Sequence, residues 1–250
     1  MDLKEAIEKR ISRRSYTGEE MSLKEKNRIN GLIDRINRTT GMSIELIEDG
    51  SSLVSGMKGY GFFKNVKEVI VLKGKKDIKN LKEKVGYYGE IIVLEAEKLN
   101  LGTCWVGGTY DRKSKLVDVS EDEVVVSLIT IGKVQENTTL KENVIRKMIH
   151  RKSKSIYDMS DCDIDMPDWF VDGIKSVVRA PSAINSQKTV ISLKNGIVYA
   201  GIAMDYPFDE VDLGIAKLHF EIICGGNFKW GNNGVWNAEE KSRYMRKLYF

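Results

Sequence analysis

The chain has few of the residues that build metal sites and disulfide frameworks. Its 250 residues include three cysteines, at positions 104, 162 and 224, and two histidines, at positions 150 and 219. The cysteines are far apart and form no Cys-x-x-Cys pair. Structural zinc sites need closely spaced ligands, and small disulfide scaffolds need many paired cysteines. The sequence therefore predicts neither a metal site nor disulfides, and a reducing compartment suits it.

The sequence also lacks a long hydrophobic run and a strong excess of one charge. It has no stretch of about 18 consecutive apolar residues, and its start, MDLKEAIEKR, has no apolar signal core. Lysine and arginine number 40 against 36 aspartates and glutamates, a net charge of +4. Nucleic-acid-binding domains usually have a larger and more clustered basic excess. We therefore expect a cytoplasmic protein that binds neither membranes nor nucleic acid.

The hydrophobic fraction of 42% is sufficient for a core, and helices and strands alternate irregularly along the chain. We expect helices at residues 2–9, 21–38, 77–99, 167–180 and 208–224. We expect strands at residues 43–47, 66–72, 103–106, 123–131, 190–193 and 197–200. Some strands directly follow strands and others follow helices, which favours the α+β class over a doubly wound α/β fold.

The helix expected at residues 21–38 has the clearest local signals. Ser22 is a suitable N-cap, and Glu25 three residues later completes a capping box. Apolar residues recur at helical spacing and predict the buried face: Ile29, Leu32, Ile33 and Ile36.

The chain shows weak similarity between two of its parts. The segment that begins at residue 29 aligns with the one that begins at residue 171, and Gly31 then matches Gly173. The segment from residue 87 aligns with the one from residue 212, and Gly89 then matches Gly214. Identity is low, so the alternatives are a two-fold duplication and chance similarity between helix–strand units. The polar stretch 153–166 is a candidate linker between the parts.

Two short basic segments are candidate anion sites. In KRISRRSY, residues 9–16, the guanidinium groups of Arg10 and Arg14 and the hydroxyl of Ser12 can converge on a tetrahedral anion such as phosphate. The alternative is a solvated basic helix end. The cluster HRKSKS, residues 150–155, is the second candidate, and its alternative is an ordinary run of charged residues.

A polar loop and a glycine pair are candidate ligand contacts. In APSAINSQ, Pro181 ends a helix, and Ser182, Asn185 and Gln187 offer hydroxyl and amide groups that suit a planar heterocycle. The alternative is an ordinary turn. Gly107 and Gly108 would allow close approach of a ligand to the backbone. Nearby Cys104 lies among apolar residues and is expected to be a buried structural thiol.

Together these motifs resemble those of the FMN-dependent nitroreductase family. The Arg-x-Ser-x-Arg motif lies at residues 10–14, Pro-Ser-x-x-Asn-x-Gln at 181–187, and Gly-Thr-Cys-Trp at 102–105. The resemblance implies the nitroreductase fold, in which helices flank a mixed, mainly antiparallel sheet. It also implies an oxidoreductase with FMN as its cofactor.

The order of the motifs differs from that of ordinary family members. There the Pro-Ser motif follows the Arg-x-Ser-x-Arg motif closely, whereas here it appears only after residue 180. Ordinary members are homodimers with two FMN sites, each built from both subunits. The chain therefore resembles a divergent single-chain subfamily, with two pseudo-symmetric halves that mimic a dimer, residues 1–155 and residues 156–250. One composite site would remain, and the arrangement is compatible with a monomer.

The resemblance implies a set of FMN-binding residues and a reaction. The residues are Arg10, Ser12, Arg14, Gly107, Gly108, Arg151, Lys152, Lys154, Pro181, Ser182, Asn185 and Gln187. No side chain receives a catalytic role, because the flavin performs the chemistry. Electrons would pass by ping-pong hydride transfer from NADH or NADPH to FMN and then to a small-molecule acceptor, such as a nitroaromatic or a quinone.

Two other functions stay open at this point. The chain could be a non-enzymatic flavin carrier or redox sensor, or a fused scaffold that has lost its cofactor. It has Lys188-Thr189 where the family often has Pro-Trp, which leaves the shape of the acceptor pocket open.

Overall fold

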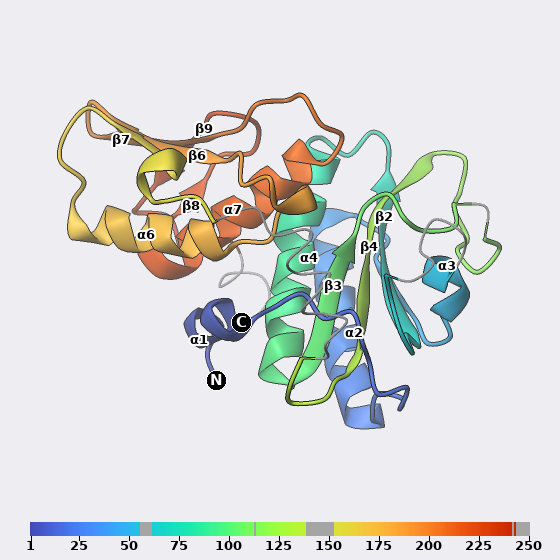
Figure 1. The fold of residues 1–250 in the computed structure, drawn as a ribbon. Coiled ribbons are helices and arrows are strands. Elements are labelled where there is room, and N and C mark those ends of the chain that lie inside the picture. The colour runs from blue at the N-terminus through green and yellow to red at the C-terminus, as the bar shows by residue number, and fades with distance from the viewer. Residues whose placement is uncertain (56–61, 113, 139–152, 242, 244–250) are drawn as a thin grey trace. The chain divides into compact units, whose positions relative to one another are not determined.

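The structure is a computed structural model that describes residues 1–250 except 56–61, 113, 139–152, 242 and 244–250 (Figure 1). The chain forms two compact units. The N-terminal unit consists of Lys9–Leu81 and Ile92–Ile149, and the C-terminal unit consists of Met1–Glu8, Lys82–Ile91 and His150–Phe250. Helix α4 (Leu81–Lys98) contributes to both units.

The N-terminal unit is built on a four-stranded antiparallel sheet with the order β1-β2-β4-β3. Its strands are β1 (Glu45–Ile47), β2 (Glu68–Lys75), β3 (Leu101–Val106) and β4 (Glu123–Lys133). The sequences of β2 and β4 are rich in valine and isoleucine, which suit a pleated and buried surface. Cys104 of β3 lies opposite Thr130 of β4.

Helices α2 (Leu23–Thr40) and α3 (Ser51–Ser55) lie on opposite sides of this sheet in Figure 1. Helix α2 has the predicted capping box, in which the backbone N–H of Ser22 donates to the Glu25 carboxylate at 2.6 Å. All four residues of its predicted apolar face are buried. From α3, Leu53 and Val54 join a core cluster with residues of β2, including Val69.

The C-terminal unit contains a five-stranded mixed sheet with the order β5-β6-β7-β9-β8, in which only β5 and β6 pair in parallel among the described strands. Its elements besides α1 (Leu3–Lys9) are η1 (Tyr157–Met159), β5 (Ser160–Cys162), α6 (Asp168–Arg179), η2 (Ala183–Asn185), β6 (Val190–Lys194), β7 (Ile197–Gly201), α7 (Asp209–Cys224), β8 (Asn227–Phe228) and β9 (Gly234–Asn237). Phe220 of α7 is a fully buried residue of the core, and its ring centroid lies 5.4 Å from that of Phe228 and 5.9 Å from that of Phe170.

Helices α4 and α7 cross within the C-terminal unit at two glycines. A Cβ added at Gly86 would lie 2.0 Å from the carbonyl oxygen of Val211, and one added at Gly214 would lie 2.0 Å from that of Glu83. Contacts that are reciprocal in this way are typical of helix pairs related by a two-fold axis. These contacts pair Gly86 with Gly214, whereas the sequence alignment pairs Gly89 with Gly214, so the two pairings differ by three residues. The duplication itself stays a prediction.

The structure confirms the α+β class and the mixed, mainly antiparallel strand pairing. Every predicted helix and strand is present, with ends that differ by up to four residues; α4, for example, begins at Leu81, after Asn80 in a left-handed conformation. The short elements α3, β5, β8 and β9 were not predicted. The division at residue 155 stays a prediction.

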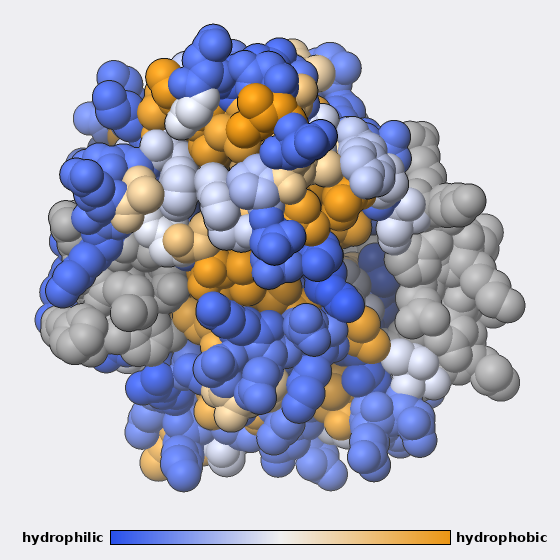
Figure 2. All heavy atoms as spheres, turned by 90° about the vertical axis from the view of Figure 1, so that its left-hand side faces the viewer, coloured by the Kyte–Doolittle hydropathy of each residue, from blue (hydrophilic) through white to orange (hydrophobic). Residues whose placement is uncertain are grey.

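The surface carries both hydrophilic and hydrophobic side chains. Figure 2 shows hydrophilic side chains (blue) over the face that is in view, with hydrophobic side chains (orange) between them. Among the helices of the described residues, none combines the length and the apolar composition that a membrane crossing requires.

Candidate functional site

The Arg10–Arg14 motif lies on an extended segment beside strand β3. Ser12 forms a parallel bridge with Thr103, and the backbone N–H of Arg13 donates to the carbonyl of Thr103 at 2.8 Å. Successive side chains of extended backbone point to opposite sides. Ser12 and Arg14 are accordingly partly exposed, whereas Arg13 and Ser15 are buried. Two of the predicted anion-binding residues therefore share one face of the segment.

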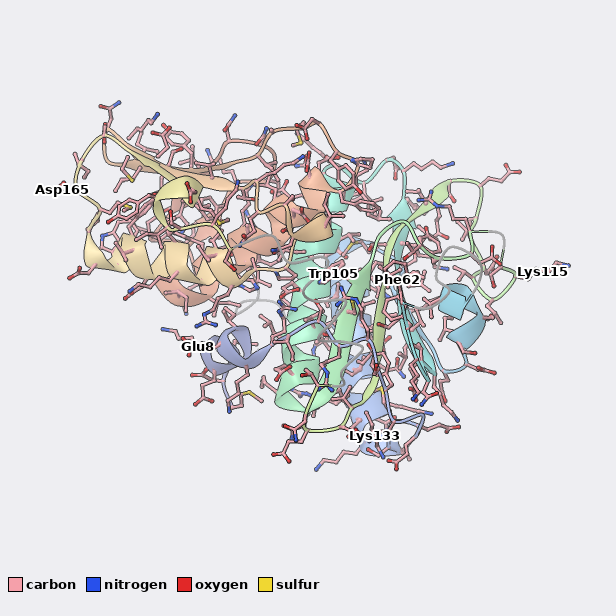
Figure 3. All side chains as sticks on the ribbon, in the orientation of Figure 1. Glu8, Phe62, Trp105, Lys115, Lys133 and Asp165 are labelled. Atoms are coloured by element: carbon pink, nitrogen blue, oxygen red, sulfur yellow. The ribbon has the colours of Figure 1, made fainter. Side chains whose placement is uncertain are left out.

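Arg13, which lies inside the motif, has a structural contact instead. Its guanidinium donates to the carbonyl of Gln135 at 3.0 Å, just beyond the end of β4. Gly102 leaves room for it, since a Cβ at position 102 would lie 2.9 Å from the Cβ of Arg13 and 2.3 Å from Val134. Arg13 thus fixes the chain that follows β4. Figure 3 labels Lys133 at the end of that strand.

Arg10 is half-buried at the start of the same segment and lies near an acidic side chain. Burial raises the pKa of Glu97, while the positive charges of Arg10, Arg13 and Lys9 act in the opposite direction. Basic residues therefore gather at this end of the segment, and Glu97 partly offsets them. A phosphate would find charged donors here.

The glycine pair follows β3 directly, two residues after Trp105, which Figure 3 labels. Gly107 is half-buried and Gly108 is exposed. A Cβ added at Gly108 would meet nothing within 4 Å, so the fold itself does not require glycine there. That open space suits close approach of a ligand to the backbone. Cys104 is only 3% exposed, as expected for a structural thiol.

The Pro-Ser loop of the C-terminal unit, residues 181–187, has an unusual backbone. Ile184, Asn185 and Gln187 have positive φ angles of 50°, 53° and 47°. Asparagine tolerates this left-handed region, but a β-branched residue such as isoleucine rarely adopts it. Such strain persists only where surrounding contacts hold it, and it is frequent at ligand sites.

Gln187 supplies several of these contacts and is only 4% exposed. Its amide nitrogen donates to the carbonyl of Val178 at 2.9 Å, and its amide oxygen accepts from the backbone N–H of Lys154 at 3.0 Å. Its own N–H donates to the hydroxyl of Ser182 at 3.0 Å. Gln187 therefore ties the predicted phosphate-binding residue Lys154 to the Pro-Ser loop.

Asp212 contacts the loop at Ala183. None of the sequence motifs includes Asp212. Both of its carboxylate oxygens accept from the backbone N–H of Ala183 at 3.0 Å. Burial raises the pKa of this carboxyl to about 7. The only sequence signal was an acid in the first turn of an expected helix, a position usually explained by the helix dipole.

The predicted site residues thus fall into one group in each unit. Arg10, Ser12 and Arg14 lie on the segment beside β3, and Gly107 and Gly108 lie at the end of that strand. Lys154, Pro181, Ser182, Asn185 and Gln187 belong to the C-terminal unit, where Gln187 connects the loop to Lys154. Arg151 and Lys152 lie outside the described residues. The first group by itself offers charged donors that suit a phosphate, and the second by itself offers hydroxyl and amide groups that suit a polar heterocycle.

Comparisons with known proteins give a family match and several related folds. The family model described as "Putative TM nitroreductase" matches residues 2–224. The crystal structure of "a putative nitroreductase" from Thermotoga maritima is 20% identical, with 94% of this chain and 92% of that chain covered and a TM-score of 0.61. At this identity the likeness shows the fold alone. No sequence match was found among curated proteins.

Shorter nitroreductases match only part of the chain. An "FMN-dependent Nitroreductase" from Clostridium difficile is 20% identical and covers 58% of this chain and 96% of its own, with a TM-score of 0.41. A "putative nitroreductase in complex with fmn" from Desulfovibrio desulfuricans is 18% identical and covers 57% of this chain and 95% of its own, with a TM-score of 0.43.

Proposed function

Because the chain belongs to the family described as putative TM nitroreductases, we propose that it is an FMN-dependent oxidoreductase that passes electrons from NADH or NADPH to a small acceptor. The Arg-x-Ser-x-Arg motif carries the proposal, since Ser12 and Arg14 share a partly exposed face of an extended segment. A dianionic phosphate is best bound by such charge-assisted donors.

Each group of residues has a role in this proposal. Arg10, Ser12 and Arg14 bind the phosphate and the polar chain of FMN, and Lys154, with Arg151 and Lys152, adds positive charge. Ser182 and Asn185 hydrogen-bond the flavin ring, and Pro181 and Gln187 fix the loop that carries them. Gly107 and Gly108 allow the backbone to approach the ring.

When bound, the flavin would supply the redox chemistry, which is hydride and electron transfer between a nicotinamide and a nitroaromatic, quinone or similar acceptor. The protein's part is to bind and orient the cofactor and to place donors where negative charge develops on the reduced ring. The protein needs no nucleophile of its own.

The test is an absorption spectrum of the purified, desalted protein, with the heat-released cofactor identified by mass. We expect a flavin spectrum and about one FMN per chain, as a single composite site implies. Reduction by NADH or NADPH followed by rapid reoxidation with a quinone would separate an enzyme from a flavin carrier. A colourless protein that also fails to bind added FMN would overturn the proposal.

Replacing Arg14 with alanine should weaken FMN binding by tenfold or more, because charge-assisted hydrogen bonds contribute about 1.5–3 kcal/mol each. Arg10→Ala should act in the same direction. The matched control is Arg38→Ala, which removes an exposed arginine from the last turn of α2. Flavin fluorescence titration measures the affinity, and circular dichroism verifies the fold. Wild-type affinity in Arg14→Ala would count against the assignment.

Replacing Gly108 with alanine should change flavin binding without changing stability. The new Cβ enters open space, so the free energy of unfolding should stay within about 0.5 kcal/mol of wild type. A flavin bound against the backbone would meet the added methyl group and bind several-fold more weakly. Gly31→Ala in α2 is the control, since a Cβ there also meets nothing within 4 Å. Equal flavin affinity in both variants would remove Gly108 from the site.

A further inference from the structure

The Pro-Ser loop requires an anchor that lies outside its own motif. Three of its residues have left-handed backbone, and each costs conformational free energy. Ile184 is 57% exposed, so burial of its own side chain cannot offset that cost. The anchoring free energy must come from contacts between the loop and the rest of the C-terminal unit.

Asp212 provides such a contact from the first turn of α7. Its side chain is buried, with only 5% of the residue exposed. Both carboxylate oxygens accept from the N–H of Ala183 at 3.0 Å, and the hydroxyl of Ser186 lies 3.5 Å from one of them. The residue is 29 positions away from Ala183 in sequence, so its contact is purely tertiary.

Several charged groups act on Asp212, and the cation among them, Lys188, has other partners. Asp209 of the same helix is 1% exposed and accepts the backbone N–H groups of Asp205 and Tyr206 at 2.9 and 2.7 Å. Lys188, which follows the loop, forms ion pairs with Asp205 and Asp209. Lys188 therefore compensates the charge of Asp212 only in part.

We propose that Asp212 is the positioning residue of the Pro-Ser loop, and that loss of its proton loosens the loop as pH rises through neutrality. The loop is a flavin-binding element only under the function proposed above, so an effect on FMN rests on that function. The effect on the loop itself does not.

The direction follows from the surroundings of the carboxyl group. Burial is the largest influence on the pKa of Asp212 and raises it, and the charge of Asp209 raises it further. Hydrogen bonds from the N–H of Ala183 and from Ser186, and the charge of Lys188, lower it. The resulting pKa is about 7. When the loop detaches, water reaches the carboxyl group and its pKa falls toward 3.8. Protons therefore bind more tightly to the attached state, and attachment weakens as pH rises.

A protonated carboxyl group can still hold the loop. Its carbonyl oxygen accepts from the N–H of Ala183, and its O–H can donate to the hydroxyl of Ser186. The ionised form has the same neighbours but loses its hydration, which makes burial of the charge costly. Asparagine at position 212 imitates the protonated form, because it keeps an acceptor and a donor without a charge.

The test is hydrogen exchange of the peptide that covers residues 180–188, in the full chain without added flavin, at pH 6 and pH 8. After correction for intrinsic exchange, wild-type protection should fall about tenfold, since one proton is lost across this window. Asp212→Asn should show no such change. Glu210→Gln, which neutralises the neighbouring acid in the same helix turn, should behave like the wild type.

Unchanged wild-type protection between the two pH values would overturn the proposal, and this measurement needs no variant to fold. A loss of the pH effect in Glu210→Gln would overturn it as well, because the cause would then be charge at the helix end in general. Glu221 also has a pKa raised to about 7 by burial, but it is present in all three proteins and cannot explain a difference between them.

Flavin binding gives a separate readout. The FMN affinity of the wild type relative to Asp212→Asn should fall between pH 6 and pH 8 in proportion to the fraction of molecules whose loop is attached, up to about tenfold where the detached form predominates. Dividing by the affinity of the variant cancels the effect of ionisation of the FMN phosphate. A wild type that binds no FMN would refute the proposed function and leave the exchange result valid. A wild type that binds FMN with a constant ratio would refute the coupling between Asp212 and the flavin.

Discussion

Replacing Gly214 with alanine should destabilise the protein by about 3 kcal/mol or more, near or above the upper end of the usual cost of overpacking. The added Cβ would lie 2.0 Å from the carbonyl oxygen of Glu83 and 2.8 Å from the backbone nitrogen of Tyr87. Both atoms are main-chain atoms of α4, so no flexible side chain can move aside. Helices α4 and α7 would have to separate where their backbones touch.

Thermal unfolding followed by circular dichroism measures this effect. For a chain of 250 residues, 3 kcal/mol corresponds to a fall in Tm of roughly 6–12 °C. Gly86→Ala should have a similar effect, because its Cβ would lie 2.0 Å from the carbonyl oxygen of Val211. Gly31→Ala is the control and should be neutral or slightly stabilising. A Tm close to that of wild type in Gly214→Ala would show that the crossing is looser than described.

The elements that the sequence predicted well are those that depend on local chemistry. Helix α2 has an N-cap at Ser22, a capping-box partner at Glu25 and an apolar face at helical spacing, and all three features appear in the structure. Strands β8 and β9 have two and four residues and little periodicity. These two strands form because each pairs with another strand, and the sequence of so short a segment does not indicate such pairing.

The sequence indicates candidate site residues where a motif is continuous, and it does not indicate residues whose contact is tertiary. The KRISRRSY segment was expected at a helix end, where the four-residue spacing would place Arg10 and Arg14 on one face. In the structure Ser12 bridges to β3, and the two-residue period of extended backbone turns Arg13 inward. Asp212 contacts a loop far away in sequence, so no local pattern could indicate its role.

Helices α4 and α7 also bring buried polar groups together next to the glycine crossing. The ammonium of Lys217 lies 2.5 Å from the Glu83 carboxylate, and the hydroxyl of Tyr87 donates to Glu221 at 2.5 Å. His219 lies 3.0 Å from Glu90. This interface needs close approach of the helices at the glycines. It also needs every buried polar group to be paired, since an unpaired one costs free energy.

Lys217 is the buried cation of this interface. It is fully buried, and besides Glu83 its ammonium donates to the carbonyls of Lys229 and Gly231 at 2.9 and 2.8 Å. Burial lowers the pKa of Lys217, while the charge of Glu83 opposes this. All three ammonium donors are therefore used within the C-terminal unit.

Replacing Lys217 with methionine should destabilise the protein by about 3–5 kcal/mol, because it keeps the volume but leaves the Glu83 carboxylate buried without its counter-charge. The double variant Glu83→Gln/Lys217→Met should recover much of this loss, since it removes the uncompensated charge. Denaturant unfolding gives both values. A deficit under about 1 kcal/mol would mean that water reaches Glu83 and that the pair is not buried as the geometry indicates.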